Sequence, residues 1–122
     1  MHSSYASDWG LDLAKELKAR QPMPTTLAYT SYILDDVVKD PASQTSDVLA
    51  AMVPCMRLYN YIGSSLKVLF GNAGSSNPFE GWVETYSSED FTETTEKLEE
   101  LLNTYAALDG RSESELLPTY KK

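Results

Sequence analysis

Apolar residues recur at helical spacing over one long stretch, residues 46–70, and the shorter segments are arranged around it. One stripe comprises Leu49, Val53, Met56, Tyr59 and Ile62, and a neighbouring stripe comprises Met52, Cys55, Tyr59 and Leu66. Because apolar groups lie around most of its circumference, we expect a central helix, started by Ser46 and Asp47. Pro54 removes a backbone donor inside this helix, so we expect a kink there.

The remaining apolar patterns predict shorter helices separated by proline and glycine. The predicted ranges are 1–9 (capped by Gly10), 11–20, 24–38, 79–86 and 88–108, with one or two further turns over 112–117, before Pro118. Residues 71–78 form a turn-rich connector after the central helix. No segment predicts a β-strand and no solenoid repeat is present, so we predict an all-α chain.

Each shorter helix has a side that the spacing predicts to face inward. These sets are Leu11, Leu13, Ala14 and Leu17; Leu27, Tyr29, Ile33, Leu34, Val37 and Val38; Phe79, Trp82, Val83 and Tyr86; and Phe91, Leu98, Leu101, Leu102, Tyr105 and Leu108. Tyr5 and Trp9 are spaced for an aromatic pair. The acidic residues Glu93, Glu96, Glu99 and Glu100 are expected on a solvated helix face.

Composition narrows the class of protein further. The 122 residues suit one domain, and 42% hydrophobic content is typical of a globular chain. Ten basic against eighteen acidic residues give a net charge of −8, which makes nucleic acid a poor partner. No apolar run reaches the length of a membrane span, and residues 1–10 lack the pattern of a signal peptide. The lone cysteine favours a reducing, cytoplasmic setting, and one histidine with one cysteine argues against structural zinc.

The residue that draws attention as candidate chemistry is Cys55, which follows Pro54 and lies one turn before Tyr59. A lone cysteine in a helix is most often a small core hydrophobe. A reactive thiol is the alternative, because the thiolate is a strong nucleophile. For Arg57 two interpretations stay open: it lowers the pKa of the neighbouring thiol, or it points to solvent.

Four segments together resemble the thiaminase II (TenA) family, which has a haem-oxygenase-like helical fold. They are Pro24 to Tyr32 (P-x-T-x-A-Y-T-x-Y in the family), Met52 to Gly63 (L-x-P-C-x-x-x-Y-x-x-[IV]-G), Trp82 to Tyr86 followed by Phe91 (W-I-x-x-Y…F), and His2 to Gly10 (H-x-x-Y-x-x-x-x-G). The segments stand in the family's order and cover nearly the whole chain. One segment alone would be a weak signal, but four in series are a specific one.

The resemblance implies an enzyme site on three of these segments. Cys55 matches the nucleophile that attacks the methylene attached to an aminopyrimidine ring, and Tyr29, Tyr59 and Tyr86 match tyrosines that line the pocket. The implied reaction is hydrolysis of thiamine or of an aminomethylpyrimidine. The implied partner is that small molecule, and no metal or organic cofactor is implied.

Two acids of the family have no counterpart here, an aspartate on an early helix and a glutamate on the last helix. We therefore expect residues 1–122 to form a single partial domain, a helical bundle lacking the first helices and the last. Activity then depends on a second chain that supplies these acids. The expected protein partners are further copies of this chain in a homo-oligomer or such a complementing chain. A non-catalytic helical module that binds pyrimidine or another protein is the alternative. A third is a chain with no independent role.

Overall fold

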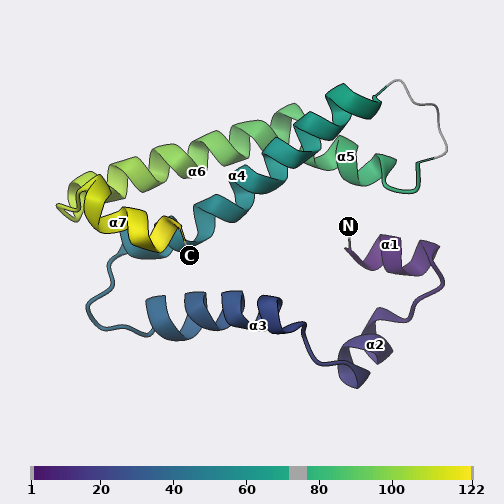
Figure 1. The fold of residues 1–122 in the computed structure, drawn as a ribbon, viewed down its shortest axis with the longest axis horizontal. Coiled ribbons are helices and arrows are strands. Elements are labelled where there is room, and N and C mark those ends of the chain that lie inside the picture. Colours follow the sequence, from purple (N-terminus) through teal and green to yellow (C-terminus); the bar gives the residue numbers. More distant parts are fainter. Residues whose placement is uncertain (1, 72–76, 122) are drawn as a thin grey trace. The chain divides into compact units, whose positions relative to one another are not determined.

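The computed structural model describes residues 2–71 and 77–121, and within them every regular element is helical (Figure 1). The elements are α1 (His2–Asp8), α2 (Leu13–Ala19), α3 (Pro24–Ser31), a π-helix η1 (Tyr32–Val37), α4 (Thr45–Phe70), α5 (Glu80–Tyr86), α6 (Glu89–Leu108) and α7 (Glu113–Tyr120). The all-α prediction is confirmed for this part of the chain. Most of the expected connector, residues 72–76, lies outside the described residues.

The chain divides into two compact units, residues 1–32 and residues 33–122. In the first unit α1 ends as predicted, because Gly10 adopts a positive φ of 70° and its N–H donates to the Ser7 carbonyl at 2.9 Å. Tyr5 and Trp9 form the expected ring pair, with centroids 6.2 Å apart. The Asp12 carboxylate caps α2 by accepting the Lys15 N–H at 3.1 Å.

The inward sets predicted for the shorter N-terminal helices are wrong in part. Leu11 and Leu17 beside and within α2 are exposed, and so is Leu27 on α3. The predicted helix 24–38 also changes type at Tyr32: over η1 the bonds widen to a π pattern, in which the Val38 N–H donates to the Ile33 carbonyl at 2.9 Å. The wider turn shifts the register of the side chains. In this part of the chain Val37 is buried, whereas Leu34 and Val38 are exposed.

In the second unit α4 and α6 run antiparallel and side by side (Figure 1). Three contacts fix this direction, because residues late in α6 pair with the start of α4 and residues early in α6 pair with its middle. They are Ser46 with Asp109, Arg57 with Glu99, and Asn60 with Thr92. Helices α5 and α7 also pack on α4, so the central position predicted for it is confirmed within this unit.

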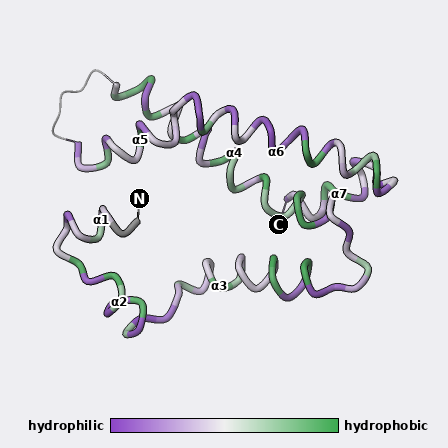
Figure 2. The backbone as a smooth tube through the Cα atoms, turned by 180° about the vertical axis from the view of Figure 1, so that it is seen from behind, coloured by the Kyte–Doolittle hydropathy of each residue, from purple (hydrophilic) through white to green (hydrophobic). Residues whose placement is uncertain are grey.

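The buried side of α4 differs from the predicted stripes. Val53 is fully buried as expected, but the neighbours that share its burial are small or polar: Ala50, Ala51, Asn60 and Gly63. Met52, Tyr59 and Ile62 are exposed, so the helices of this unit leave this part of the apolar stripes uncovered or only partly covered. Small residues let the backbones of the other helices approach closely, and this moved the interface off the larger apolar stripe. Figure 2 shows polar and apolar residues alternating along the partner helix α6.

The ends of α4 correct one prediction and confirm another. Gln44, not Ser46, caps the helix: it exchanges hydrogen bonds with Asp47, whose carboxylate accepts the Gln44 N–H at 3.0 Å. Ser46 is fully buried instead. The helix ends at Gly71 as predicted, and it continues through Pro54 as one element. A bend at that proline stays a prediction.

The last three helices bury fewer large side chains than their patterns predict. Tyr86 is buried as expected, and the Ser88 hydroxyl caps α6 by accepting the Phe91 N–H at 3.1 Å. Phe79, Leu101 and Leu108 are exposed, contrary to prediction, whereas Thr95 is fully buried. Pro118 does not end α7, which continues to Tyr120 because its packing on α4 offsets one missing donor.

Candidate active site

Four aromatic rings form a cluster where α5 meets α4 and the start of α6. Tyr86 lies at its centre, 4.8 Å from Tyr59, 4.6 Å from Trp82 and 4.8 Å from Phe91 between ring centroids. Tyr59 and Trp82 are 5.9 Å apart, and the Phe91 ring meets Tyr86 edge-on. Such tilted and edge-on pairs are favourable arrangements for aromatic quadrupoles. Two of the predicted site residues, Tyr59 and Tyr86, are therefore brought into ring contact.

Cys55 is a free cysteine, partly buried, and it lies one helical turn before Tyr59 on the same side of α4. Its neighbours along that side, Met52 and Ile62, are exposed. The thiol is thus on the same side of the helix as the part of the ring cluster that α4 contributes. Tyr29, the remaining predicted residue, belongs to α3 in the other unit, so its place in the site stays a prediction.

Arg57 points neither to the thiol nor simply to solvent. Its Nε donates to Glu99 Oε1 at 2.6 Å and its NH2 group donates to the second carboxylate oxygen, which makes a two-bond ion pair between α4 and α6. The hydrogen bond to Glu99 raises the pKa of Arg57. Residues two apart face different sides of a helix, so Arg57 is directed away from Cys55. The expectation that Glu99 is only solvated is corrected by the same contact.

Two residues next to the cluster, Asn60 and Gly63, were not singled out from the sequence for a role in the site. The Asn60 side chain is buried, and its Nδ2 donates to the Tyr86 carbonyl at 3.1 Å and to Thr92 Oγ1 at 2.9 Å. A methyl group at position 63 would lie 2.7 Å from the Tyr86 carbonyl carbon. The sequence did carry a signal for these two residues. Asn60 and Gly63 follow Val53 by seven and ten positions, which places all three on the same side of a helix.

Two charged side chains, Asp109 and Arg111, bind the start of α4, away from the ring cluster at its middle. The Asp109 carboxylate accepts the Ser46 N–H at 2.9 Å, and this bond lowers the pKa of Asp109. Arg111 donates to Asp47 Oδ1 at 2.6 Å. Both contacts join the N-terminal end of α4 to the end of α6 and the residues after it. They orient the helix that carries Cys55 but touch none of the predicted site residues.

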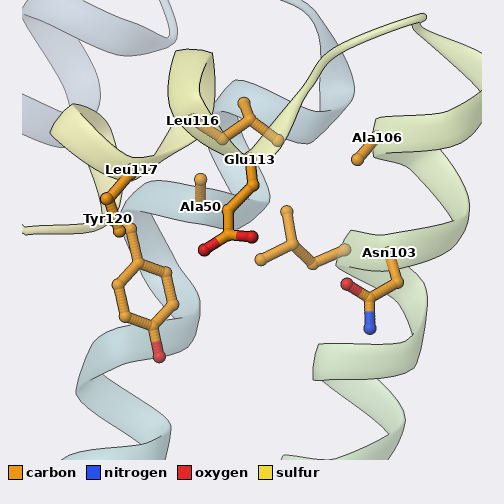
Figure 3. Close-up of a pocket in the computed structure, with 8 residues that line it drawn as sticks. Ala50, Asn103, Ala106, Glu113, Leu116, Leu117 and Tyr120 are labelled. Carbon is orange, nitrogen blue, oxygen red and sulfur yellow. The ribbon is translucent and has the colours of Figure 1, made fainter.

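A pocket of about 240 Å³ opens elsewhere in the second unit, between α4, α6 and α7 (Figure 3). Its lining residues are Ala50, Leu102, Asn103, Ala106, Glu113, Leu116, Leu117 and Tyr120. The Glu113 carboxylate is directed over the pocket between Leu117 and Asn103 (Figure 3). The lining is mostly apolar and includes neither Cys55 nor a ring of the cluster. This pocket is therefore separate from the site that the sequence predicts.

Among residues 2–71 and 77–121, no three histidine, cysteine, aspartate or glutamate side chains gather closely enough to hold a metal ion. None of the helices in that part of the chain is long and apolar enough to cross a membrane.

Comparison with known proteins gives several relatives. The chain is 38% identical over 104 residues to an aminopyrimidine aminohydrolase of Halalkalibacterium halodurans, covering 84% of this chain and 44% of that protein. It is 30% identical over 108 residues to the aminopyrimidine aminohydrolase of Bacillus subtilis, covering 88% and 42%. The mitochondrial bifunctional TH2 protein of Arabidopsis thaliana is 30% identical over 117 residues, covering 84% and 18%. The chain thus spans less than half the length of these relatives. No solved structure matches it significantly.

The family comparison covers almost the whole chain. Residues 1–118 match the TENA/THI-4/PQQC family, and the helices described above agree with that family's haem-oxygenase-like helical fold. The resemblance drawn from the four sequence segments is therefore confirmed. This chain belongs to the TENA/THI-4/PQQC family.

Proposed function

We propose that this chain forms part of an aminopyrimidine aminohydrolase of the thiaminase II type, with Cys55 as its nucleophile. The observation that carries the proposal is the ring cluster of Tyr59, Trp82 and Tyr86, on the side of α4 where Cys55 lies. The names of the Halalkalibacterium halodurans and Bacillus subtilis relatives support the same substrate class. Flat rings beside a thiol are the arrangement expected for a site that binds a flat heterocycle and attacks its side chain.

The reaction consists of two displacements at the methylene carbon. The Cys55 thiol first loses its proton, and the thiolate forms an S–C bond while the C–N bond breaks. The departing amine takes a proton from an acid and leaves as ammonia. Water then attacks the same carbon and gives a proton to the conjugate base of that acid, the S–C bond breaks, and the hydroxymethylpyrimidine leaves while the thiolate is restored. Splitting the hydrolysis in this way uses a nucleophile that is also a good leaving group.

The tyrosines have binding roles in this proposal. Tyr59 and Tyr86 stack on the pyrimidine or bond its edge through their hydroxyl groups, and Tyr29 is proposed to line the same pocket. Tyr86 is buried and lies between Trp82 and Phe91, so its ring is held firmly. A fixed ring loses little freedom when a ligand stacks on it, which favours affinity.

The acid that protonates the amine has no counterpart in the matched motifs. We therefore include in the proposal a complementing chain that supplies the aspartate and glutamate. A homo-oligomer is a separate part of the proposal and does not by itself provide these acids. A reducing, cytoplasmic compartment also belongs to the proposal, because a thiolate nucleophile must remain unoxidised between turnovers.

The test is turnover of aminomethylpyrimidine, followed as ammonia release and hydroxymethylpyrimidine formation. The 122-residue chain is assayed alone and after mixing with the segments of the Halalkalibacterium halodurans relative that lie outside the match. We expect the mixture to be active and Cys55→Ser to reduce turnover by several orders of magnitude, because serine is a far weaker nucleophile without a base. Met52→Ala, on the same side of α4, is the matched control. Equal turnover by Cys55→Ser and the wild type would refute the role of Cys55.

A non-catalytic binding module remains the second candidate, and one observation favours it. The side of α4 that carries Cys55 leaves large apolar groups exposed, including Met52 and Ile62, and such surface is typical of interaction sites. This candidate predicts measurable binding of aminomethylpyrimidine without turnover, unaffected by Cys55→Ser. Titration calorimetry on the samples of the turnover assay separates the two.

A further inference from the structure

Asn60 is a buried polar side chain in the packed side of α4, only 6% exposed, one position after Tyr59. A side-chain amide carries two N–H donors, and Nδ2 has two acceptors here: the Tyr86 carbonyl at 3.1 Å and Thr92 Oγ1 at 2.9 Å. The bonds reach two different helices, the end of α5 and the first turn of α6. Asn60 therefore joins three helices at the ring cluster.

The bond to Tyr86 reaches a backbone carbonyl at the end of α5. Tyr86 is the last residue of α5, and the final carbonyls of a helix have no partner within it. Asn60 supplies the Tyr86 carbonyl with a hydrogen-bond donor from another helix. The Thr92 hydroxyl, which accepts from Asn60, in turn donates to the Ser88 carbonyl at 2.9 Å. The corner between α5 and α6 is thereby tied to α4.

Gly63 makes a second, independent contact with the same residue. It lies three positions after Asn60 on the same side of α4. A methyl group there would lie 2.7 Å from the Tyr86 carbonyl carbon and 2.7 Å from its Cβ, closer than side-chain carbons approach. One residue bonds the Tyr86 backbone and the other leaves room for it. Together they fix where the base of the Tyr86 side chain lies.

From these contacts we propose that Asn60 is a positioning residue, which holds the Tyr86 ring at its place between Tyr59 and Trp82. It acts through the Tyr86 backbone and touches no substrate. Because Asn60 fixes the Tyr86 ring, a ring surface for a flat heterocycle is already formed before the ligand binds. Loss of Asn60 therefore weakens ligand binding by more than the loss of stability explains. This inference rests on the proposed function only where the ligand is concerned. The placement of the rings in the free protein is a separate part of it.

The test compares Asn60→Leu with a control of similar stability. The control is Thr95→Ala, which removes a fully buried side chain from α6 whose hydroxyl donates to the Phe91 carbonyl. All variants carry Trp9→Phe, so that Trp82 is the one tryptophan left of the two in the sequence. Unfolding midpoints establish that the two variants are destabilised alike. Near-ultraviolet circular dichroism and Trp82 emission then report the ring cluster in the free protein.

We expect Asn60→Leu to change both Trp82 signals and to weaken binding of aminomethylpyrimidine about tenfold, because the ring surface is then no longer preformed and must be ordered when the ligand binds. Thr95→Ala should leave the signals unchanged and the affinity within about twofold, because the hydrogen bond that it removes, from the Thr95 hydroxyl to the Phe91 carbonyl, lies within α6. Unchanged Trp82 signals in Asn60→Leu, or an equal loss of affinity in Thr95→Ala, would overturn the inference. Binding is measured after mixing with the complementing segments of the turnover assay. If no such mixture binds the pyrimidine, the proposed function fails, and the Trp82 signals of the unmixed chain alone decide about Asn60. Should Asn60→Leu not fold, Asn60→Asp serves, since it keeps the shape without the N–H donors.

Discussion

The two sides of α4 differ in a way that separates folding from chemistry. The packed side presents Ala50, Val53, Asn60 and Gly63 to the later helices of its unit, and all four are buried. The other side carries Cys55 with larger neighbours such as Met52 and Ile62, which stay exposed. In this helix, burial follows how closely a backbone can approach, not how hydrophobic the side chain is. The side that carries Cys55 meets α5 through Tyr59, and it otherwise leaves larger side chains exposed.

The largest effect is expected from filling the closest approach on the packed side. Gly63→Val places methyl groups within the space of the Tyr86 backbone, which cannot yield as a flexible side chain would. We expect the free energy of unfolding to fall by about 3 kcal/mol, at the upper end for overpacked sites. Urea denaturation followed by circular dichroism measures the loss. Ile62→Val, one position away on the exposed side, should change stability by less than about 1 kcal/mol. Similar losses at the two positions would contradict the distinction between the sides.

A cavity at the centre of the packed side should cost somewhat less. Val53 is fully buried, so Val53→Ala removes methyl groups from the packed interior and leaves a void. The expected loss is about 2 kcal/mol. Met52→Ala removes more atoms, but its side chain is about half exposed at 48%, so its loss should stay below about 1 kcal/mol. If the side that carries Cys55 were the true core, Met52→Ala would lose more stability than Val53→Ala. Thermal unfolding of the two variants measures which loss is larger.

The sequence predicts the order, type and approximate bounds of the helices, because glycine caps, prolines and Ser88 act locally. It does not predict which side of α4 is buried. Period alone marks the broad stripe through Met52, Tyr59 and Ile62, whereas the interface depends on Gly63 meeting the Tyr86 backbone, a contact between residues far apart in sequence. Likewise the matched motifs gave Tyr59 and Tyr86 as neighbours, but nothing local indicates that Asn60 bonds the end of α5.

The ion pair beside the packed side should contribute little. Arg57 and Glu99 join α4 to α6 through two bonds, but their side chains are 43% and 30% exposed, so water screens the attraction. A double-mutant cycle with Arg57→Gln and Glu99→Gln should give a coupling of about 0.5–1 kcal/mol. The coupling should decrease in high salt. The pair Lys97 and Glu93, which lies within α6 alone, is the control and should couple more weakly. A coupling at Arg57 that ignores salt would indicate a tighter, drier interface than this geometry implies.

The smallest effect concerns the charge that holds the start of α4. The Ser46 N–H lowers the pKa of Asp109 below its ordinary value of 3.8, so the folded state favours the ionised carboxylate. Its contribution is therefore fully present above that ordinary value and is lost as the pH falls through the lowered one. Asp109→Asn keeps an acceptor for the N–H and removes only the charge. We expect its stability deficit, measured by urea denaturation from about pH 7 to about pH 3, to shrink towards zero at the acid end. A deficit that stays constant down to the lowest pH would mean that the Asp109 charge does not stabilise this end of the helix, and that the hydrogen-bond geometry alone holds α4 against α6.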